Sequence, residues 1–263
     1  MELIVVIGVG GMGTACARRL GSGHRLLLAD CDAKQLQSAA GELSADGFDV
    51  RTQMMDVSDR EAVAQLAEAA RHLGPLRTLV LTAGVSPLMA GSARIYEVDL
   101  LGTALVLDAF VELARAGSVA VVIASMAGSF IPVSAELERA LASLPAAQLL
   151  DAVAGLHRDE PQLAYCLAKR GTQLRVQAAA LPWAARGARV VSVSPGLIAT
   201  PMGRLEQSSP EVAAVLANCP LKRIGNTEDI AAAVQWLASP AAGYVTGTDL
   251  RIDGGSVAAL LAG

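Results

Sequence analysis

The sequence of 263 residues has few aromatic side chains, few lysines and no long apolar run. Its net charge of −4 provides no basic surface for a phosphate backbone, so a nucleic acid is not an expected partner. No apolar run approaches the ~20 residues that a membrane helix needs, so no membrane association is expected. The first residues, MELIVVIG, lack the basic start and the long apolar stretch of a signal peptide. A cytoplasmic protein is therefore expected.

Cysteine and histidine are also scarce and widely spaced. The sequence has no C-x-x-C pair, and its three histidines lie far apart. This spacing matches neither a disulfide framework nor a zinc site, so no metal is expected. The cysteines are Cys16, Cys31, Cys166 and Cys219, and the histidines are His24, His72 and His157.

The sequence does contain a repeated alternation of short apolar runs and alanine-rich helical segments. The clearest runs are residues 3–7, 25–29, 78–82, 118–124, 188–194 and 248–252, and residues 50–55 form a weaker seventh. Apolar strands that alternate with helices are typical of a parallel sheet covered by helices on both faces. No internal repeat or linker-like tract interrupts residues 1–263. The sequence therefore predicts an α/β fold: a single doubly wound domain with a parallel sheet of about seven strands.

A glycine-rich loop follows the first apolar run directly. In the segment GVGGMG, Gly8, Gly10 and Gly13 have the G-x-G-x-x-G spacing, and a helical segment comes next. Glycines at this spacing permit a tight turn and let the backbone approach a pyrophosphate at a helix N-terminus. The loop therefore predicts a Rossmann-type dinucleotide site, which also includes Gly11 and Met12.

Asp30 stands at the end of the second apolar run. A carboxylate at this place would hold a ribose 2′-hydroxyl and would repel a 2′-phosphate. The alternative is that Asp30 caps the following helix, although Asp32 could serve as that cap instead. The sequence thus favours NAD over NADP as the cofactor.

Tyr165 and Lys169 stand four residues apart in the segment AYCLAKRG, in a chain with only three tyrosines and three lysines. Residues 161–185 predict a helix, with Pro161 suited to its first turn. Positions four apart share one face of a helix, so the two side chains are within reach of each other. The two residues form either a surface pair on a solvated helix or a functional pair.

Together these features resemble the short-chain dehydrogenase/reductase family. Asp56-Val57, after the third apolar run, is similar to the family's adenine-contacting pair. Thr82-Ala83-Gly84 stands in the place of the family's Asn-Ala-Gly. Ser125 ends a strand, as the family's catalytic serine does. Each of these pieces follows a different strand of the expected sheet.

The resemblance extends to about Ser256. Residues 194–200 resemble the family's Pro-Gly loop on the nicotinamide side, and RIGNTEDIAAAVQWLAS resembles its C-terminal segment. The resemblance implies that Ser125, Tyr165, Lys169 and Asp99 make up the catalytic set. It implies cofactor contacts from Gly8, Gly10, Gly11, Met12, Gly13, Asp30, Asp56, Val57, Thr82, Ala83, Gly84, Tyr165, Lys169, Pro195, Gly196, Ile198 and Thr200.

The resemblance implies a role in proton transfer for the pair of Tyr165 and Lys169. A free phenol has a pKa of about 10, and an ammonium one helical turn away favours the phenolate and lowers that pKa. Lys169 also resembles the family lysine that binds the nicotinamide ribose, and Ser125 would hydrogen-bond the substrate oxygen. Tyr165 would take a proton from an alcohol or give one to a carbonyl. An oxidoreductase that uses NAD is therefore expected.

Three positions depart from the family's pattern. The family's usual glycine motif is T-G-x-x-x-G-x-G, whereas Ile7 is followed here by GVGGMG, and Thr82 replaces an asparagine. Asp99 stands where the family has a further catalytic asparagine. Its carboxylate could hold a water for proton relay, or could hinder the arrangement by its charge. These departures leave open a catalytically weak NAD-binding sensor or scaffold, and an NADP-dependent carbonyl reductase is a further alternative.

Residues 126–164 do not follow the alternation of strands and helices. Their sequence predicts two short amphipathic helices, broken at Pro145, as an insertion between the Ser125 strand and the Tyr165 helix. One interpretation is a lid or specificity element beside the active site, and the other is part of an interface between subunits.

The substrate is expected to be an apolar secondary alcohol or its ketone. Ligands of open α/β sheets bind outside the carboxyl ends of the strands. By that rule an uncharged pocket wall is expected from Pro87, Leu88, Met126, Ile131, Leu197 and Met202. The family is commonly dimeric or tetrameric, and the apolar tail VAALLAG is consistent with burial against a partner subunit. A homotetramer or homodimer is therefore expected.

Overall fold

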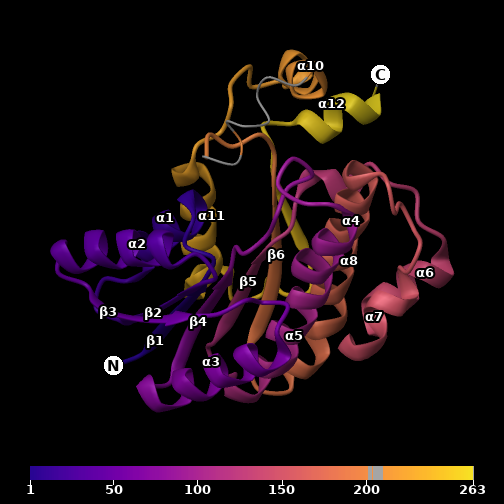
Figure 1. Cartoon of the computed structure of the whole chain (residues 1–263). Coiled ribbons are helices and arrows are strands. Elements are labelled where there is room, and N and C mark those ends of the chain that lie inside the picture. The colour runs from indigo at the N-terminus through magenta and orange to yellow at the C-terminus, as the bar shows by residue number, and fades with distance from the viewer. Residues whose placement is uncertain (201–202, 204–209, 263) are drawn as a thin grey trace.

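The computed structural model describes residues 1–200, 203 and 210–262. Its strands form one seven-stranded parallel sheet in the order β3-β2-β1-β4-β5-β6-β7 (Figure 1). The strands are β1 (Leu3–Ile7), β2 (Arg25–Asp30), β3 (Asp49–Met54), β4 (Leu76–Leu81), β5 (Val119–Ile123), β6 (Arg189–Pro195) and β7 (Asp249–Ile252). Every apolar run singled out in the sequence forms one of these strands. The predicted α/β fold with a doubly wound parallel sheet is confirmed.

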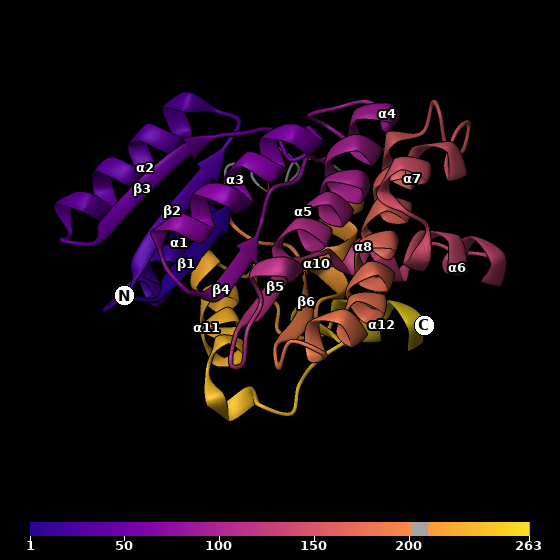
Figure 2. The same ribbon diagram turned by 90° about the horizontal axis from the view of Figure 1, so that it is seen from below.

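Helices cover both faces of the sheet. One face is covered by α1 (Gly11–Leu20), α2 (Ala33–Ala45) and α11 (Thr227–Ala238). The other is covered by α3 (Arg60–Leu73), α5 (Gly102–Phe110) and α8 (Pro161–Ala184), which lie side by side in Figure 2. The shorter helices are α4 (Ser92–Ile95), the π-helix η1 (Tyr96–Leu101), η2 (Val111–Leu113), η3 (Met126–Ser129), α6 (Ala135–Ser143), α7 (Ala146–Ala152), α10 (Pro210–Asn218), η4 (Pro240–Ala242) and α12 (Ser256–Ala262).

The strands are apolar throughout because both of their faces are buried. All five residues of β1 are buried: Leu3, Val5 and Ile7 pack into one core cluster, and Ile4 and Val6 pack into the cluster on the opposite face. Side chains alternate across a strand, so a central strand of this sheet must supply apolar groups at every position.

The strand order reverses between β1 and β4. The chain runs from β1 outward to β3 and then returns to β4, which pairs with the other side of β1. At such a switch point the loops that leave the two neighbouring strands diverge, and ligands of open α/β sheets bind in the crevice between them. The topology therefore predicts that a ligand binds at the carboxyl ends of β1 and β4.

The insertion at residues 126–164 contains the two predicted helices, α6 and α7, which are separated at Pro145. They lie beside α8 and η1, on the side of these helices away from the sheet (Figure 1). Arg170 of α8 holds α6 in place through its guanidinium, which lies 2.5 Å from the Glu138 carboxylate.

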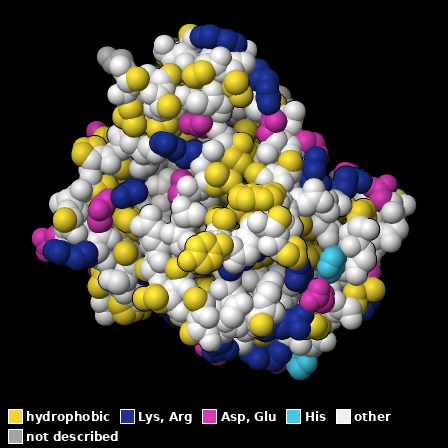
Figure 3. Space-filling model, turned by 180° about the vertical axis from the view of Figure 1, so that it is seen from behind, with side chains coloured by type: hydrophobic (Ala, Val, Ile, Leu, Met, Phe, Trp, Pro, Cys, Tyr) yellow, Lys and Arg dark blue, Asp and Glu magenta, His cyan; other side chains and the backbone are white. Residues whose placement is uncertain are grey.

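The back face of the molecule carries apolar side chains. Figure 3 shows them gathered near the centre of this face, below the lobe that α10 and α12 form, with charged side chains mostly around the margin. Within the described residues, every helix is too short or too polar to cross a bilayer.

A glycine controls how closely α8 approaches η1. A Cβ added at Gly171 would lie 2.5 Å from Cδ1 of Leu100, and Leu100 is fully buried. The absence of a side chain at position 171 therefore permits the helix contact that brings the functional face of α8 to its neighbour.

We expect Gly171→Ala to lower the free energy of unfolding by about 1–3 kcal/mol, because the added methyl group overpacks a closed core contact. Urea denaturation monitored by circular dichroism measures the change. Gly41→Ala is the matched control, because Gly41 is an exposed position in α2 with no atom near its added Cβ. That control should stabilise the protein slightly. Equal effects of the two substitutions would contradict the packing argument.

Candidate active site

The glycine loop is fixed by contact with the end of β4. Gly8 has φ +90°, and an added Cβ would collide with the backbone nitrogen of Ala83. A Cβ at Gly13 would overlap the carbonyl oxygen of Gly8. The Thr82 hydroxyl donates a hydrogen bond of 2.5 Å to that same carbonyl. Thr82, which replaces the family's asparagine, thus ties the loop after β1 to β4 with its hydroxyl.

The N-terminus of α1 is suited to an anionic group. Gly10 precedes the helix and supplies no side-chain acceptor for the N–H groups of the first turn. Those N–H groups and the helix dipole favour a phosphate. A Cβ at Gly11 would lie 3.3 Å from Cγ2 of Thr200, so the loop after β6 borders the glycine loop. The structure thus brings these predicted cofactor-binding segments to one place.

Asp30 is turned toward the glycine loop at the end of β2. Its Oδ2 accepts hydrogen bonds from the Val9 N–H at 2.8 Å and from Nε2 of Gln35 at 3.0 Å. Asp32 is the residue that caps α2, with its carboxylate accepting from the N–H groups of Lys34 and Gln35. The interpretation of Asp30 as the helix cap is therefore wrong. Its carboxylate is held in place beside the glycine loop.

Asp56 is bound by an arginine that the sequence patterns did not identify. The Arg94 guanidinium lies 2.5 Å from the Asp56 carboxylate, and Ser58 donates to it from its N–H and its hydroxyl. Partial burial raises the pKa of Asp56, but the bonds from Ser58 and Arg94 outweigh it and leave the pKa below its ordinary value. Val57 is buried against Gly102 of α5.

Ser125 ends β5 and begins η3. Its Oγ accepts a hydrogen bond of 3.1 Å from the Ala127 N–H, and its side chain is partly exposed. Gln173 of α8 donates to the Ser125 carbonyl at 3.3 Å and to the Ser194 hydroxyl at 3.0 Å. Sequence reasoning missed Gln173, although its position one helical turn after Lys169 places it on the same inward face.

Tyr165 and Lys169 lie on the inward face of α8. The Lys169 Nζ is 5.5 Å from the centre of the Tyr165 ring, and Lys169 is only 5% exposed. The same Nζ lies 3.5 Å from the carbonyl oxygen of Ile123, two residues before Ser125. The interpretation as a solvated surface pair is therefore wrong, and α8 presents the pair to the end of β5.

Asp99 lies in the π-helix η1 and pairs with Lys169. Its Oδ1 is 2.7 Å from the Lys169 Nζ, and its Oδ2 accepts a hydrogen bond of 3.2 Å from the Val85 N–H. Burial raises the pKa of Asp99, and Lys169 opposes that effect. Burial lowers the pKa of Lys169, but the neighbouring Asp99 outweighs it and raises the pKa above its ordinary value.

Gly84 provides the room for this ion pair. An added Cβ at position 84 would lie 2.6 Å from Oδ1 of Asp99 and 3.2 Å from Nζ of Lys169. Single-turn π-helical segments are frequent at functional sites, and η1 carries Asp99 to this point. The Asp99 carbonyl accepts hydrogen bonds from the hydroxyls of Thr103 and Thr172, which fasten η1 to α5 and α8.

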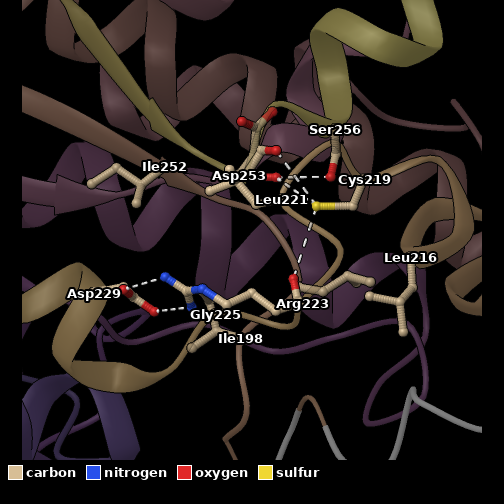
Figure 4. A pocket seen from close by; sticks show the side chains of 12 residues that line it. Ile198, Leu216, Cys219, Leu221, Arg223, Gly225, Asp229, Ile252, Asp253 and Ser256 are labelled. Carbon is tan, nitrogen blue, oxygen red and sulfur yellow. Dashed lines mark hydrogen bonds and ion pairs between the residues drawn. The ribbon is translucent and has the colours of Figure 1, made fainter.

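The loop after β6 borders a narrow pocket, shown in Figure 4. Leu197 and Ile198 line it together with residues that follow α10 and β7. Gly196 packs closely on Asp253, since an added Cβ would lie 2.7 Å from its Cα. Arg223 and Asp229 form a two-pronged ion pair at the side of this pocket.

The expected apolar pocket wall is only partly assembled. Leu197 lines the pocket of Figure 4, whereas Met126 is buried and Ile131 packs against the core. Leu88 is 64% exposed, beside the half-buried Pro87. Met202 lies outside the described residues.

The arrangement fits a dinucleotide cofactor. The close contacts of Gly8 and Gly13 leave a turn of bare backbone before α1, and the first turn of that helix has no side-chain cap. Asp30, the Tyr165 and Lys169 pair and the Thr200 loop border the same carboxyl edge of the sheet. The residues present therefore match a ligand that combines phosphate, ribose and a reactive ring.

Comparison with known proteins agrees with this geometry. A family model described as short chain dehydrogenase matches residues 2–136, and one described as Enoyl-(Acyl carrier protein) reductase matches residues 129–257. The chain is 38% identical over 265 aligned residues to the short-chain dehydrogenase/reductase bsc3 of Alternaria brassicicola, an alignment that covers 98% of this chain and 96% of the relative.

One further relative and one solved structure are similar to this chain over most of its length. The galactitol 2-dehydrogenase (L-tagatose-forming) of Cereibacter sphaeroides is 34% identical, with 95% of this chain and 92% of the relative covered. The crystal structure of gox2181 superposes with a TM-score of 0.79 at 25% identity, covering 98% of this chain and 96% of that one. The chain belongs to the short-chain dehydrogenase/reductase family, whose members are oxidoreductases that use nicotinamide cofactors.

Proposed function

We propose that this protein is an NAD-dependent oxidoreductase that interconverts a secondary alcohol and its ketone, with Tyr165 as the acid and base. The observation that carries this proposal is the inward-facing pair of Tyr165 and Lys169, which α8 holds against the end of β5. A protein that only bound a dinucleotide would need the glycine loop and Asp30, but it would not need a tyrosine and a buried lysine at this place.

The preference for NAD rests on Asp30. Its carboxylate is fixed beside the glycine loop by Val9 and Gln35. A fixed negative charge at the end of β2 suits a ribose 2′-hydroxyl and repels a 2′-phosphate. The nearby Arg94 forms ion pairs with Asp56 and Glu97, and these carboxylates compensate the positive charge that could otherwise bind a 2′-phosphate.

The chain's own residues supply the proton chemistry. When bound, the nicotinamide cofactor supplies or accepts a hydride. Tyr165 takes the hydroxyl proton of an alcohol or gives its own proton to a carbonyl oxygen. Ser125 donates its hydroxyl hydrogen to the substrate oxygen and holds it for that transfer. Lys169 would hold the ribose of the cofactor with the N–H groups that its contact with Asp99 leaves available.

The substrate class follows from the site and from one relative. The relative from Cereibacter sphaeroides is a galactitol 2-dehydrogenase by name, which supports chemistry at a CH–OH group. For this chain we propose an apolar alcohol or ketone, because Leu197 and Ile198 of the loop after β6 line the adjacent pocket. Apolar side chains in a pocket favour substrates with little polar surface outside the reacting oxygen.

We expect the protein to bind NAD⁺ and NADH more tightly than NADP⁺ and NADPH, and Asp30→Asn to reduce this preference about tenfold or more by removing the repulsive charge. Titration of each cofactor, followed by protein fluorescence, measures the four affinities. Asp32→Asn is the matched control, because its carboxylate is occupied in capping α2. Tighter binding of NADP(H) by the unaltered protein would overturn the assignment of Asp30.

We expect Tyr165→Phe to lower the rate of alcohol oxidation by about 10²- to 10⁴-fold while cofactor binding persists, since the proton acceptor is lost. The measurement is NADH formation from NAD⁺ across a panel of apolar secondary alcohols. Tyr244→Phe is the control, because Tyr244 is fully exposed on the surface. Cofactor binding without turnover on a broad panel would instead favour the sensor or scaffold function.

We also propose that the chain forms a homodimer or homotetramer. Large apolar side chains are exposed at several places: Leu261 of α12 is 69% exposed and Leu181 of α8 is 81% exposed. Exposed apolar surface of this kind marks contact with a partner. Light scattering is expected to give the mass of two or four chains, and the mass of one chain would contradict the proposal.

A further inference from the structure

The Asp99 carboxylate is enclosed by protein partners. Oδ1 lies 2.7 Å from the Lys169 Nζ, Oδ2 accepts from the Val85 N–H, and the two side chains of the ion pair are 0% and 7% exposed. Lys169 is therefore the charged partner of this carboxylate. This arrangement identifies Asp99 as the counter-ion of Lys169.

Tyr165 is the further titratable group that faces the ion pair. Asp99 and Tyr165 both act electrostatically on Lys169, and Lys169 acts on Asp99. The charged side chains on the elements packed around η1 and α8 have other partners or are exposed: Arg94 of α4 binds Asp56 and Glu97, Asp108 of α5 faces Arg175, Arg170 of α8 binds Glu138, and Asp151 of α7 is exposed.

The charge that Tyr165 experiences is therefore that of a pair. An unpaired ammonium near a phenol favours the phenolate. Here a carboxylate lies 2.7 Å from the ammonium, which is itself 5.5 Å from the centre of the phenol ring. The negative charge of Asp99 opposes the effect of the ammonium on the phenol. Lys169 therefore helps the phenol to give up its proton less than an unpaired ammonium would.

We propose that Asp99 is a positioning residue that neutralises Lys169 and so keeps Tyr165 protonated at neutral pH, which makes the site a better proton donor than proton acceptor. This inference rests on the proposed function. It deepens that function by assigning a pH dependence: near neutrality the protonated phenol serves ketone reduction, and the maximal rate of alcohol oxidation is low. Alcohol oxidation then requires a more alkaline medium, in which the phenol loses its proton.

Substitution of the carboxylate by its neutral isostere tests the proposal. In Asp99→Asn the ammonium is no longer paired, so Tyr165 should lose its proton at a lower pH than in the unaltered protein. Tyrosines labelled with ¹³C at Cζ report this by NMR titration without cofactor or turnover. Tyr165→Phe identifies the Tyr165 resonance, and burial raises the pKa of Tyr96 to about 12.

The kinetic counterpart uses both directions of the reaction. In Asp99→Asn the ratio of the maximal oxidation rate to the maximal reduction rate, each measured with saturating substrate and cofactor at pH 7, should rise about tenfold, which corresponds to one pKa unit at the phenol. Asp108→Asn is the matched control, since it removes a carboxylate from α5 that faces Arg175 at 4.0 Å and whose side chain is 58% exposed. The control should leave the ratio unchanged.

Two outcomes would overturn the proposal. One is an Asp99→Asn protein, folded by circular dichroism, whose Tyr165 titrates at the same pH as in the unaltered protein. The other needs no variant: a Tyr165 phenol in the unaltered, cofactor-free protein that ionises at or below about pH 8, roughly two units under a free phenol. Absence of turnover alone would refute the proposed function, while the NMR titration would still decide the role of Asp99.

Discussion

The parallel pairing of the sheet is the constraint on which the rest of the structure depends. Neighbouring parallel strands must be joined by connections that cross a face of the sheet, and helices in those connections bury both faces. The carboxyl ends of all strands then meet at one edge. The loops that leave this edge carry Gly8 after β1, Thr82 after β4, Ser125 after β5 and Gly196 after β6. Topology thus assembles the site from segments far apart in the sequence.

Close backbone contacts hold this edge together. Gly8 and Gly13 have no space for side chains, so the turn before α1 lies directly on the segment after β4. Two side chains form hydrogen bonds with the backbone of this turn. The Thr82 hydroxyl donates to the Gly8 carbonyl, and the Asp30 carboxylate accepts from the Val9 N–H. An altered glycine pattern therefore still gives a fixed loop, because side chains from two other strands satisfy its backbone groups.

The buried ion pair explains why a lysine occurs at position 169 in a lysine-poor chain. Removal of water from two charges is costly, and leaving one of them unpaired in the interior costs about 3–5 kcal/mol. Asp99 supplies the opposite charge, and the missing side chain of Gly84 leaves space for the compact ammonium of Lys169. The broader, planar guanidinium of an arginine would not fit the same contact. Asp99 is thus part of the electrostatic environment of the lysine.

The sequence by itself determined the strands, the Tyr165 helix with Tyr165 and Lys169 on one face, and the break at Pro145, because apolar periodicity, proline and four-residue spacing act locally along the chain. Only the tertiary structure decided that Asp99 pairs with Lys169, that Asp30 turns to Val9 instead of capping a helix, and that the two helices of the insertion lie along the outer side of α8. These contacts join residues distant in sequence, and packing and desolvation in the folded chain select them.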